Sequence, residues 1–195
     1  MINKGFRNMV IATVLTVALA VAGTGCTEKL TENSDNTVPT AQTTLDPMSF
    51  AAIDARIRDY NFSINEYMRE HQAEATQKKV SGKTFNGVAA ECTYTISPDG
   101  KYESLQMEKT ITNGVQIDEY FNFGDAVFIA RTTVYSDGNF DPVEKFYIID
   151  GGLYKVDGSA ETVTKMIDLN DPTAEDFKKT NDLYFTFDEI RAIYA

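Results

Sequence analysis

The first regular pattern of apolar positions begins after Asp46 and repeats at alternating steps of three and four residues, as on one face of an amphipathic helix. Asp46 suits an N-cap, and Pro47 suits the first helical position, where a missing N–H costs nothing. Lys78 and Lys79 suit the negative end of the helix dipole, so we extend the helix to them and end it before Gly82. The apolar stripe comprises Phe50, Ile53, Ile57, Tyr60, Ile64 and Tyr67.

After this helix, the chain breaks into short segments that alternate between apolar and polar residues and are separated by turn signals, which is typical of β-strands. The clearest turn signals are Ser97-Pro98-Asp99-Gly100 and Asn113-Gly114. Every link is short, so successive strands are expected to pair as an antiparallel meander in an α+β fold. The six expected strands cover 88–96, 102–112, 115–123, 126–135, 143–149 and 153–156.

Two of the later strands are apolar on both sides. Phe128 and Val134 oppose Val127, Ile129 and Tyr135 in the first, and Tyr147 and Ile149 oppose Phe146 and Ile148 in the second. A strand with one wet face would alternate cleanly, so this part of the sheet is covered on both faces or curls around an interior. The long N-terminal helix is one expected cover.

We expect the second cover from the C-terminal segment, as short helical elements. Thr173 and Asp176 fit a capping box, and Leu183, Phe187, Ile190 and Tyr194 have helical spacing. The alternative for residues 183–187 (LYFTF) is a last strand.

The N-terminal residues have the pattern of an export signal. Lys4 and Arg7 precede an uncharged apolar run over residues 10–22. This run is shorter than the roughly 20 apolar residues that a membrane-spanning helix needs.

The residues that follow, Gly23-Thr24-Gly25-Cys26, resemble the bacterial lipoprotein signal, although that family usually has an aliphatic residue where this chain has Gly23. The resemblance implies that residues 1–25 are removed and that Cys26 becomes a lipidated N-terminus, with diacylglycerol on its sulfur and a further acyl chain such as palmitate. Two or more chains make anchoring stable. The alternative is an ordinary secretory signal, cut for example after Ala22, that leaves Cys26 as a spare thiol.

Residues 26–46 are polar, with only Leu30, Val38 and Leu45 as sizeable apolar residues after the cysteine, so we expect a disordered tether. As a flexible coil it would span roughly 25 Å. Residues 47–195 then form a single α+β domain of ordinary size.

The charge and the cysteine content of the chain limit the kinds of binding partner that we expect. The 29 acids and 18 bases give a net charge of −11, and loss of Lys4 and Arg7 with the signal leaves −13. Such a chain is repelled by nucleic acid and by anionic headgroups, so we expect no nucleic-acid partner and a covalent membrane anchor. Cys92 is then a lone cysteine on the inward side of a strand, where it acts as a small hydrophobe.

A weak internal repeat supports the hairpin architecture. EYFNFGDAVFIA (119–130) and KFYIIDGGLYKV (145–156) each contain two aromatic residues, a tight glycine turn and a return strand. Similar hairpin units occur in uncharacterised lipoproteins of gut bacteria. The resemblance implies architecture and no activity.

Catalytic and metal motifs are scarce, so we expect no cofactor and no metal. His71 is the one histidine, which leaves no Ser-His-Asp or Cys-His set. The loop Asp137–Asp141 has the D-x-N-x-D spacing of a calcium loop, but Pro142 and Ile148 occupy the positions where an EF-hand needs glycine and glutamate.

Three functional hypotheses follow. The first is a membrane-anchored, non-enzymatic module that binds a small hydrophobic ligand or an envelope protein, with the two-faced strands as the candidate site. The same aromatic residues are expected in the core if no ligand binds. The second is an envelope hydrolase with two carboxylates that converge in a cleft, at least one of them with a raised pKa. The third is a purely structural or envelope-assembly role, which predicts an exposed apolar patch on an edge strand instead of a pocket. The candidate ligand-binding residues are Phe128, Tyr135, Phe146, Tyr147 and Tyr154.

Overall fold

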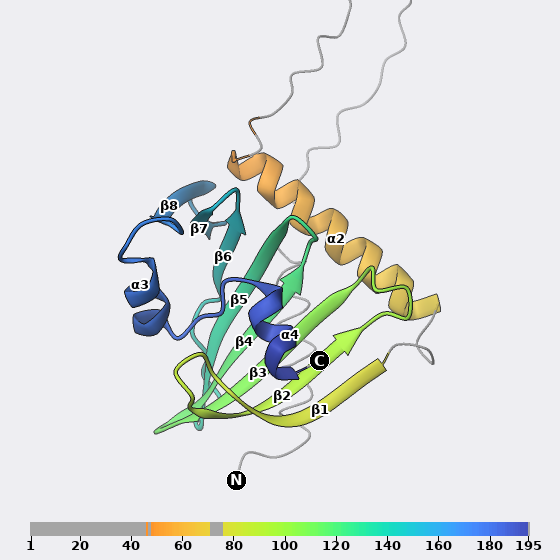
Figure 1. The fold of residues 1–195 in the computed structure, drawn as a ribbon, viewed down its shortest axis with the longest axis vertical. Coiled ribbons are helices and arrows are strands. Elements are labelled where there is room, and N and C mark those ends of the chain that lie inside the picture. The colour runs from red at the N-terminus through yellow and green to blue at the C-terminus, as the bar shows by residue number, and fades with distance from the viewer. Residues whose placement is uncertain (1–45, 47, 71–75, 195) are drawn as a thin grey trace, which may run out of the picture.

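The computed structural model describes residue 46, residues 48–70 and residues 76–194 of the chain. Within these described residues, eight strands form one antiparallel sheet in sequence order and are accompanied by three helices, so the α+β class and the antiparallel meander are confirmed (Figure 1). The elements are α2 (Phe50–Glu70), β1 (Thr76–Lys83), β2 (Ala89–Ile96), β3 (Glu103–Ile111), β4 (Gly114–Asn122), β5 (Ala126–Tyr135), β6 (Glu144–Ile149), β7 (Gly152–Asp157), β8 (Thr162–Asp168), α3 (Ala174–Asn181) and α4 (Phe187–Tyr194).

The expected count of six strands is wrong, because β1 and β8 extend the sheet at its two edges. Lys78 and Lys79, which we assigned to the end of a helix, lie in β1 opposite Tyr94 and Thr93 of β2. Pairing with β2 therefore outweighs the helix-end signals of these lysines. Strand β8 has no regular alternation of apolar residues and is mostly exposed, which is why its sequence pattern did not predict it.

Helix α2 also begins later than expected, at Phe50, because Ser49 and not Asp46 caps it. The Ser49 hydroxyl accepts a hydrogen bond from the Ala52 N–H at 3.3 Å. Asp46 instead accepts one from the Met48 N–H at 2.9 Å, in the turn before the helix.

At the C-terminal end, residues 183–186 form an irregular link between α3 and α4, so the alternative of a last strand is wrong. Thr173 is the N-cap residue of α3, but its side chain makes no capping hydrogen bond, so the predicted capping box is absent. The Thr173 hydroxyl instead donates to Asp171 at 2.6 Å.

The two faces of the sheet carry separate cores. On the α2 face, Ile53 and Ile57 of the helix pack on residues from β4 to β7, which include Phe128 and Tyr147. On the opposite face, which we call the α4 face, residues 183–194 pack on Val127, Phe146 and other residues of β2 to β7. In Figure 1, α4 lies across the front of the central strands, and α2 runs diagonally from the side of β6 towards that of β2.

A buried arginine fastens residues 181–182 to the sheet. Arg131 of β5 donates to both carboxylate oxygens of Asp118 on β4, at 2.6 and 2.8 Å. It also donates to the backbone carbonyls of Asn181 and Asp182, at 2.7 and 3.2 Å. The Asp118 side chain is only 4% exposed, and Arg131 is its ion-pair partner, while the Gln116 side-chain amide also donates to both of its oxygens at 3.2 Å.

A second arginine fastens α4. Arg191 donates to the two oxygens of buried Glu103, at 2.9 and 2.5 Å, and Asn122 donates to the same carboxylate at 2.7 Å. Burial opposes the charge of Glu103, but these hydrogen bonds and one from Tyr94 outweigh burial and lower the pKa of Glu103.

The end of α4 also contacts the edge strand β1. The Lys83 N–H donates to the Tyr194 hydroxyl at 3.0 Å, and the Tyr184 hydroxyl donates to the Lys83 carbonyl at 2.8 Å. The Tyr194 ring lies over Gly82, where an added Cβ would come within 2.2 Å of the ring. Only glycine therefore fits beneath this ring.

We expect Arg131→Met to lower the free energy of unfolding by about 3–5 kcal/mol, because it leaves the Asp118 charge buried and unpaired. Urea unfolding followed by circular dichroism measures the change. Arg131→Met combined with Asp118→Leu should recover most of the loss, since no charge then remains. The control is Arg58→Met, which removes the exposed pair with Asp54 and should cost less than about 1 kcal/mol. Equal losses for the two single variants would contradict the fastening role of Arg131.

Candidate functional site

Alternate hairpin turns of a meander return to the same end of the sheet, so the β2–β3, β4–β5 and β6–β7 turns gather at one end. Two hollows flank the β4–β5 turn there, because Asn122 and Gly124 line both of them. A third hollow lies at the opposite end, between β5 and β7. We refer to them as the α4 hollow, the α2 hollow and the β5–β7 hollow.

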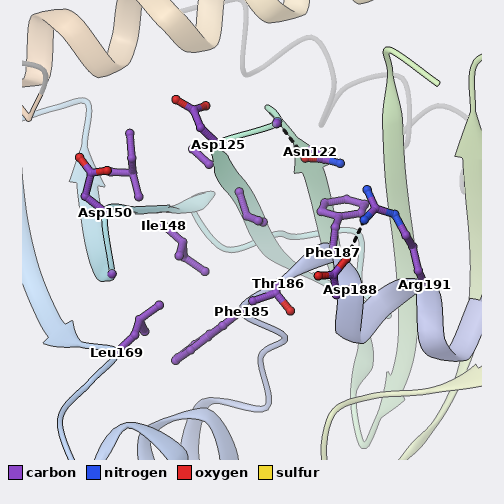
Figure 2. Close-up of a pocket in the computed structure, with 15 residues that line it drawn as sticks. Asn122, Asp125, Ile148, Asp150, Leu169, Phe185, Thr186, Phe187, Asp188 and Arg191 are labelled. Carbon is purple, nitrogen blue, oxygen red and sulfur yellow. Dashed lines mark hydrogen bonds and ion pairs between the residues drawn. The ribbon is translucent and has the colours of Figure 1, made fainter. Parts of the chain in front are cut away.

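The α4 hollow has a volume of about 260 Å³, with an apolar floor that includes Val127, Ile148 and Phe185. Figure 2 shows Asp125 and Asp150 on one part of its rim, and Asp188 with Arg191 on another. Arg191 is already bound to Glu103 and, at 2.7 Å, to Asp188. This hollow is smaller than the roughly 300 Å³ at which ligand pockets begin.

The β5–β7 hollow is larger, at about 880 Å³, but its polar lining is largely committed to bonds within the protein. Arg131 donates hydrogen bonds to Asp118 and to the backbone carbonyls of residues 181–182, as described above. Lys155 pairs with Glu144 at 2.8 Å, and the Thr132 hydroxyl donates to the Asp141 carbonyl at 2.8 Å. This hollow thus offers a ligand few free groups.

The α2 hollow has a volume of about 360 Å³ and lies between α2 and the β2–β3 and β4–β5 turns. Tyr60 of α2 contacts Phe123 with ring centroids 4.2 Å apart and Tyr102 with centroids 5.8 Å apart. Phe123 in turn stacks on Phe128 at 6.1 Å and meets Tyr147 at 6.0 Å. The lining residues are Arg56, Asp59, Tyr60, Ser63, Lys101, Tyr102, Asn122, Phe123 and Gly124.

Arg56 connects this hollow to the exposed β4–β5 turn. Its guanidinium group forms an ion pair with Asp125, and the hydrogen bond from Arg56 lowers the pKa of Asp125. The same group lies 5.7 Å from the ring centroid of Phe123 and 5.9 Å from that of Tyr147. Arg56 therefore holds the helix, the turn and the aromatic group together.

Unpartnered polar atoms gather on the α2 side of the sheet. Among the described residues, the buried side-chain atoms without a hydrogen-bond partner are Tyr60 Oη, Asn61 Nδ2, Gln106 Nε2 and Tyr147 Oη. Gln106 faces α2 because its neighbours Leu105 and Met107 pack on the α4 face. Burial raises the pKa of Tyr147 to about 12 and raises that of Tyr60 as well. Buried groups of this kind normally have partners, so this side is where a ligand can supply them.

The predicted ligand-binding residues are distributed over both cores and both ends of the sheet. Phe128 and Tyr147, each 1% exposed, lie in the α2 core behind Phe123, and Tyr154 packs against the same core. Phe146 belongs to the core of the α4 face. Tyr135 lies away from both cores, where its hydroxyl donates to Asp141 at 2.9 Å.

The residues that line the α2 hollow were not among those predictions. The sequence could have indicated two of them by their position next to turns. Tyr102 follows the Asp99-Gly100 turn, and Phe123 precedes the Gly124-Asp125 turn. Two aromatic residues next to turns at the same end of a meander lie close together. The spacing of Arg56, Tyr60 and Ser63 then places all three on one side of α2.

One carboxylate has a strongly raised pKa, as the hydrolase hypothesis requires. Glu119 is 6% exposed, and burial alone raises its pKa to about 7. It lies on β4 directly between Gln106 of β3 and Ala130 of β5, so neither adjoining strand places a second carboxylate opposite it. It also lines none of the three hollows.

Metal chemistry has no support among the described residues, where no group of three or more His, Cys, Asp or Glu side chains could hold an ion. In the Asp137–Asp141 loop, Asp137 accepts bonds from the backbone and side-chain nitrogens of Asn139, both at 3.0 Å. Asp141 accepts the Tyr135 hydroxyl. His71 lies outside the described residues.

We expect Glu119→Gln to stabilise the protein above pH 7, by up to about 3 kcal/mol. The folded state holds a proton on Glu119 between the ordinary pKa of 4.5 and about 7, so folding becomes less favourable as pH rises through this window. Urea unfolding of both proteins from pH 4 to pH 8 tests this. The difference should be small at pH 4 and grow with pH. Glu66→Gln, an exposed change on α2, is the control, and a pH-independent difference for Glu119→Gln would refute the assignment.

Within the part of the chain that the structure describes, no helix is both long and apolar enough to cross a membrane. Cys26 and the signal that precedes it lie outside the described residues. No family model, curated protein or solved structure matches the chain. Its function therefore has to be inferred from its own residues.

Proposed function

We propose that the chain is a membrane-anchored, extracytoplasmic binding module without enzymatic activity, and that it binds a small ligand with an apolar part in the α2 hollow. The observation that carries this proposal is an open hollow of about 360 Å³ between α2 and two turns, walled by the aromatic rings of Tyr60, Tyr102 and Phe123. Ligand pockets are mostly apolar cavities of roughly 300–1,000 Å³ with a few polar groups that fix the orientation of the ligand.

We choose among the three hollows by their volume and by the lining side chains that remain available to a ligand. The α4 hollow is the smaller of the two at this end of the sheet, and most of the polar groups of the β5–β7 hollow are engaged within the protein. Of the three hollows described, the α2 hollow combines a larger volume than the α4 hollow with a wall of aromatic rings. A ligand there would gain ring contacts.

The anchor part of the proposal is supported by the N-terminal sequence. An uncharged apolar run, small residues before Cys26 and a polar segment up to Asp46 follow one another in the order of a lipoprotein signal and tether. Helix α2 is the first described helix after that segment, so the α2 hollow would lie within a tether length, roughly 25 Å, of the membrane.

The anchor is tested with Cys26→Ser in the native host. We expect the wild-type chain to incorporate labelled palmitate and to remain with the membranes after a high-salt wash, whereas Cys26→Ser should incorporate none and be released. Mass spectrometry of the mature N-terminus identifies the modification directly. The control is Cys92→Ser, which removes the other, buried thiol and should leave labelling unchanged. A Cys26→Ser chain that stays membrane-bound would exclude the lipid anchor.

The binding site is tested by filling the α2 hollow with Ser63→Trp. Wild-type protein extracted from its own envelope should carry a small molecule, which native mass spectrometry detects. The fraction of protein that carries this molecule should be at least about tenfold lower for Ser63→Trp. Phe62→Trp is the matched control, because Phe62 is the next residue and its side chain is 66% exposed. Equal occupancy of the two variants, or an empty wild-type protein, would contradict the proposal.

A further inference from the structure

We propose that the ligand of the α2 hollow is a zwitterion of the amino-acid type with an aromatic side chain, bound between Asp59 and Lys101. This inference rests on the proposed function and adds the chemical class of the ligand. It follows from the rings, the charges and the volume of the hollow, in that order.

The rings provide one wall for an aromatic group. Tyr60 and Phe123 lie close and tilted by 38°, and Tyr102 stands edge-on to Tyr60 at 72°. Aromatic rings prefer offset or edge-to-face contacts with centroids about 4.5–7 Å apart, so a further ring can extend this cluster without displacing its members. Phe123 is also backed by Phe128 and Tyr147, which fixes the wall in place.

Three charged side chains line the hollow, and only one of them has an ion-pair partner. Arg56 is paired with Asp125. Asp59 and Lys101 form no salt bridge within the described residues, and Arg58, the neighbour of Asp59, is paired with Asp54 at 3.1 Å. Two unpaired charges of opposite sign therefore remain at the rim.

Lys101 is held near the rings, where it attracts Asp99 but forms no salt bridge among the described residues. Its ammonium group lies 5.2 Å from the ring centroid of Tyr102. The nearby Asp99 carboxylate is occupied by the Ser97 hydroxyl at 2.6 Å and the Lys101 backbone N–H at 3.0 Å. Lys101 can therefore receive the carboxylate of a ligand.

A ligand that satisfies both charges must carry an ammonium group for Asp59 and a carboxylate for Lys101. A simple organic anion would leave Asp59 unmatched, and a simple amine would leave Lys101 unmatched. The volume of about 360 Å³ is near the lower end of the range for ligand pockets, which suits a single amino acid or a dipeptide better than a lipid.

The test is calorimetric titration of the full chain with three probes that share one ring: L-phenylalanine, 3-phenylpropionate and 2-phenylethylamine. We expect L-phenylalanine to bind about twofold to fivefold more tightly than either analogue, because each analogue lacks one charge and an exposed pair is worth about 0.4–1 kcal/mol. Ser63→Trp should abolish binding of all three probes.

Two charge variants report on specificity even if they alter the overall affinity. Lys101→Gln should remove the preference for L-phenylalanine over 2-phenylethylamine, and Asp59→Asn should remove the preference over 3-phenylpropionate. Lys79→Gln, an exposed lysine on β1, is the matched control and should change neither preference.

Equal affinity for the three probes, binding of one analogue in preference to L-phenylalanine, or preferences unchanged in both charge variants would overturn the inference. If L-phenylalanine does not bind but Ser63→Trp still removes a molecule acquired from the envelope, the ligand class is wrong and the proposed binding function stands. If neither occurs, both are wrong.

Discussion

The apolar character of both faces of the central strands is the constraint from which the rest of the structure follows. Val127 and Phe128 are adjacent in β5, point to opposite faces and are both buried, so neither face can be left to water. One helix on one face would leave the other face exposed. The chain therefore needs a cover on each side, and it supplies them from opposite ends of the folded region.

Both covers bury apolar residues, and the cover of the α4 face adds buried ion pairs. Leu183, Phe187 and Ile190 pack into the core there, and two arginines, each of which satisfies a buried carboxylate, fasten residues 181–191. Helix α2 depends mainly on the burial of Ile53 and Ile57, and its ion pair with the sheet joins Arg56 to an exposed turn. Further along α2, the sheet beneath is more polar, because Gln106 and Glu119 pair there on the face towards the helix, and the Gln106 amide nitrogen is buried without a hydrogen-bond partner. The α2 hollow itself lies at the end of the sheet, where α2 passes the β2–β3 and β4–β5 turns beside Tyr102 and Phe123.

The sequence pattern predicted the central meander well, because strands 89–96, 103–111 and 114–122 combine clear alternation with turn residues. It did not predict the edges, since β1 carries lysines that also suit a helix end and β8 has no alternation. The candidate site was the hardest part. Large buried aromatic residues such as Phe128 stand out in a sequence, but a hollow forms from side chains on separate elements. Tyr60, Tyr102 and Phe123 meet only because α2 crosses the sheet at a particular angle.

The position of the α4 cover has a consequence for the order of folding. Tyr194 is fully enclosed and lies against Gly82, more than a hundred residues earlier in the chain. A ribosome delivers the strands long before it delivers this tyrosine, so Leu105, Ile129 and Leu153 cannot be shielded on that side while synthesis continues. Contacts of such long sequence separation slow folding, so these hydrophobic side chains stay exposed to water for longer. The α4 face of the sheet can therefore be closed only after residues 183–194 have been made.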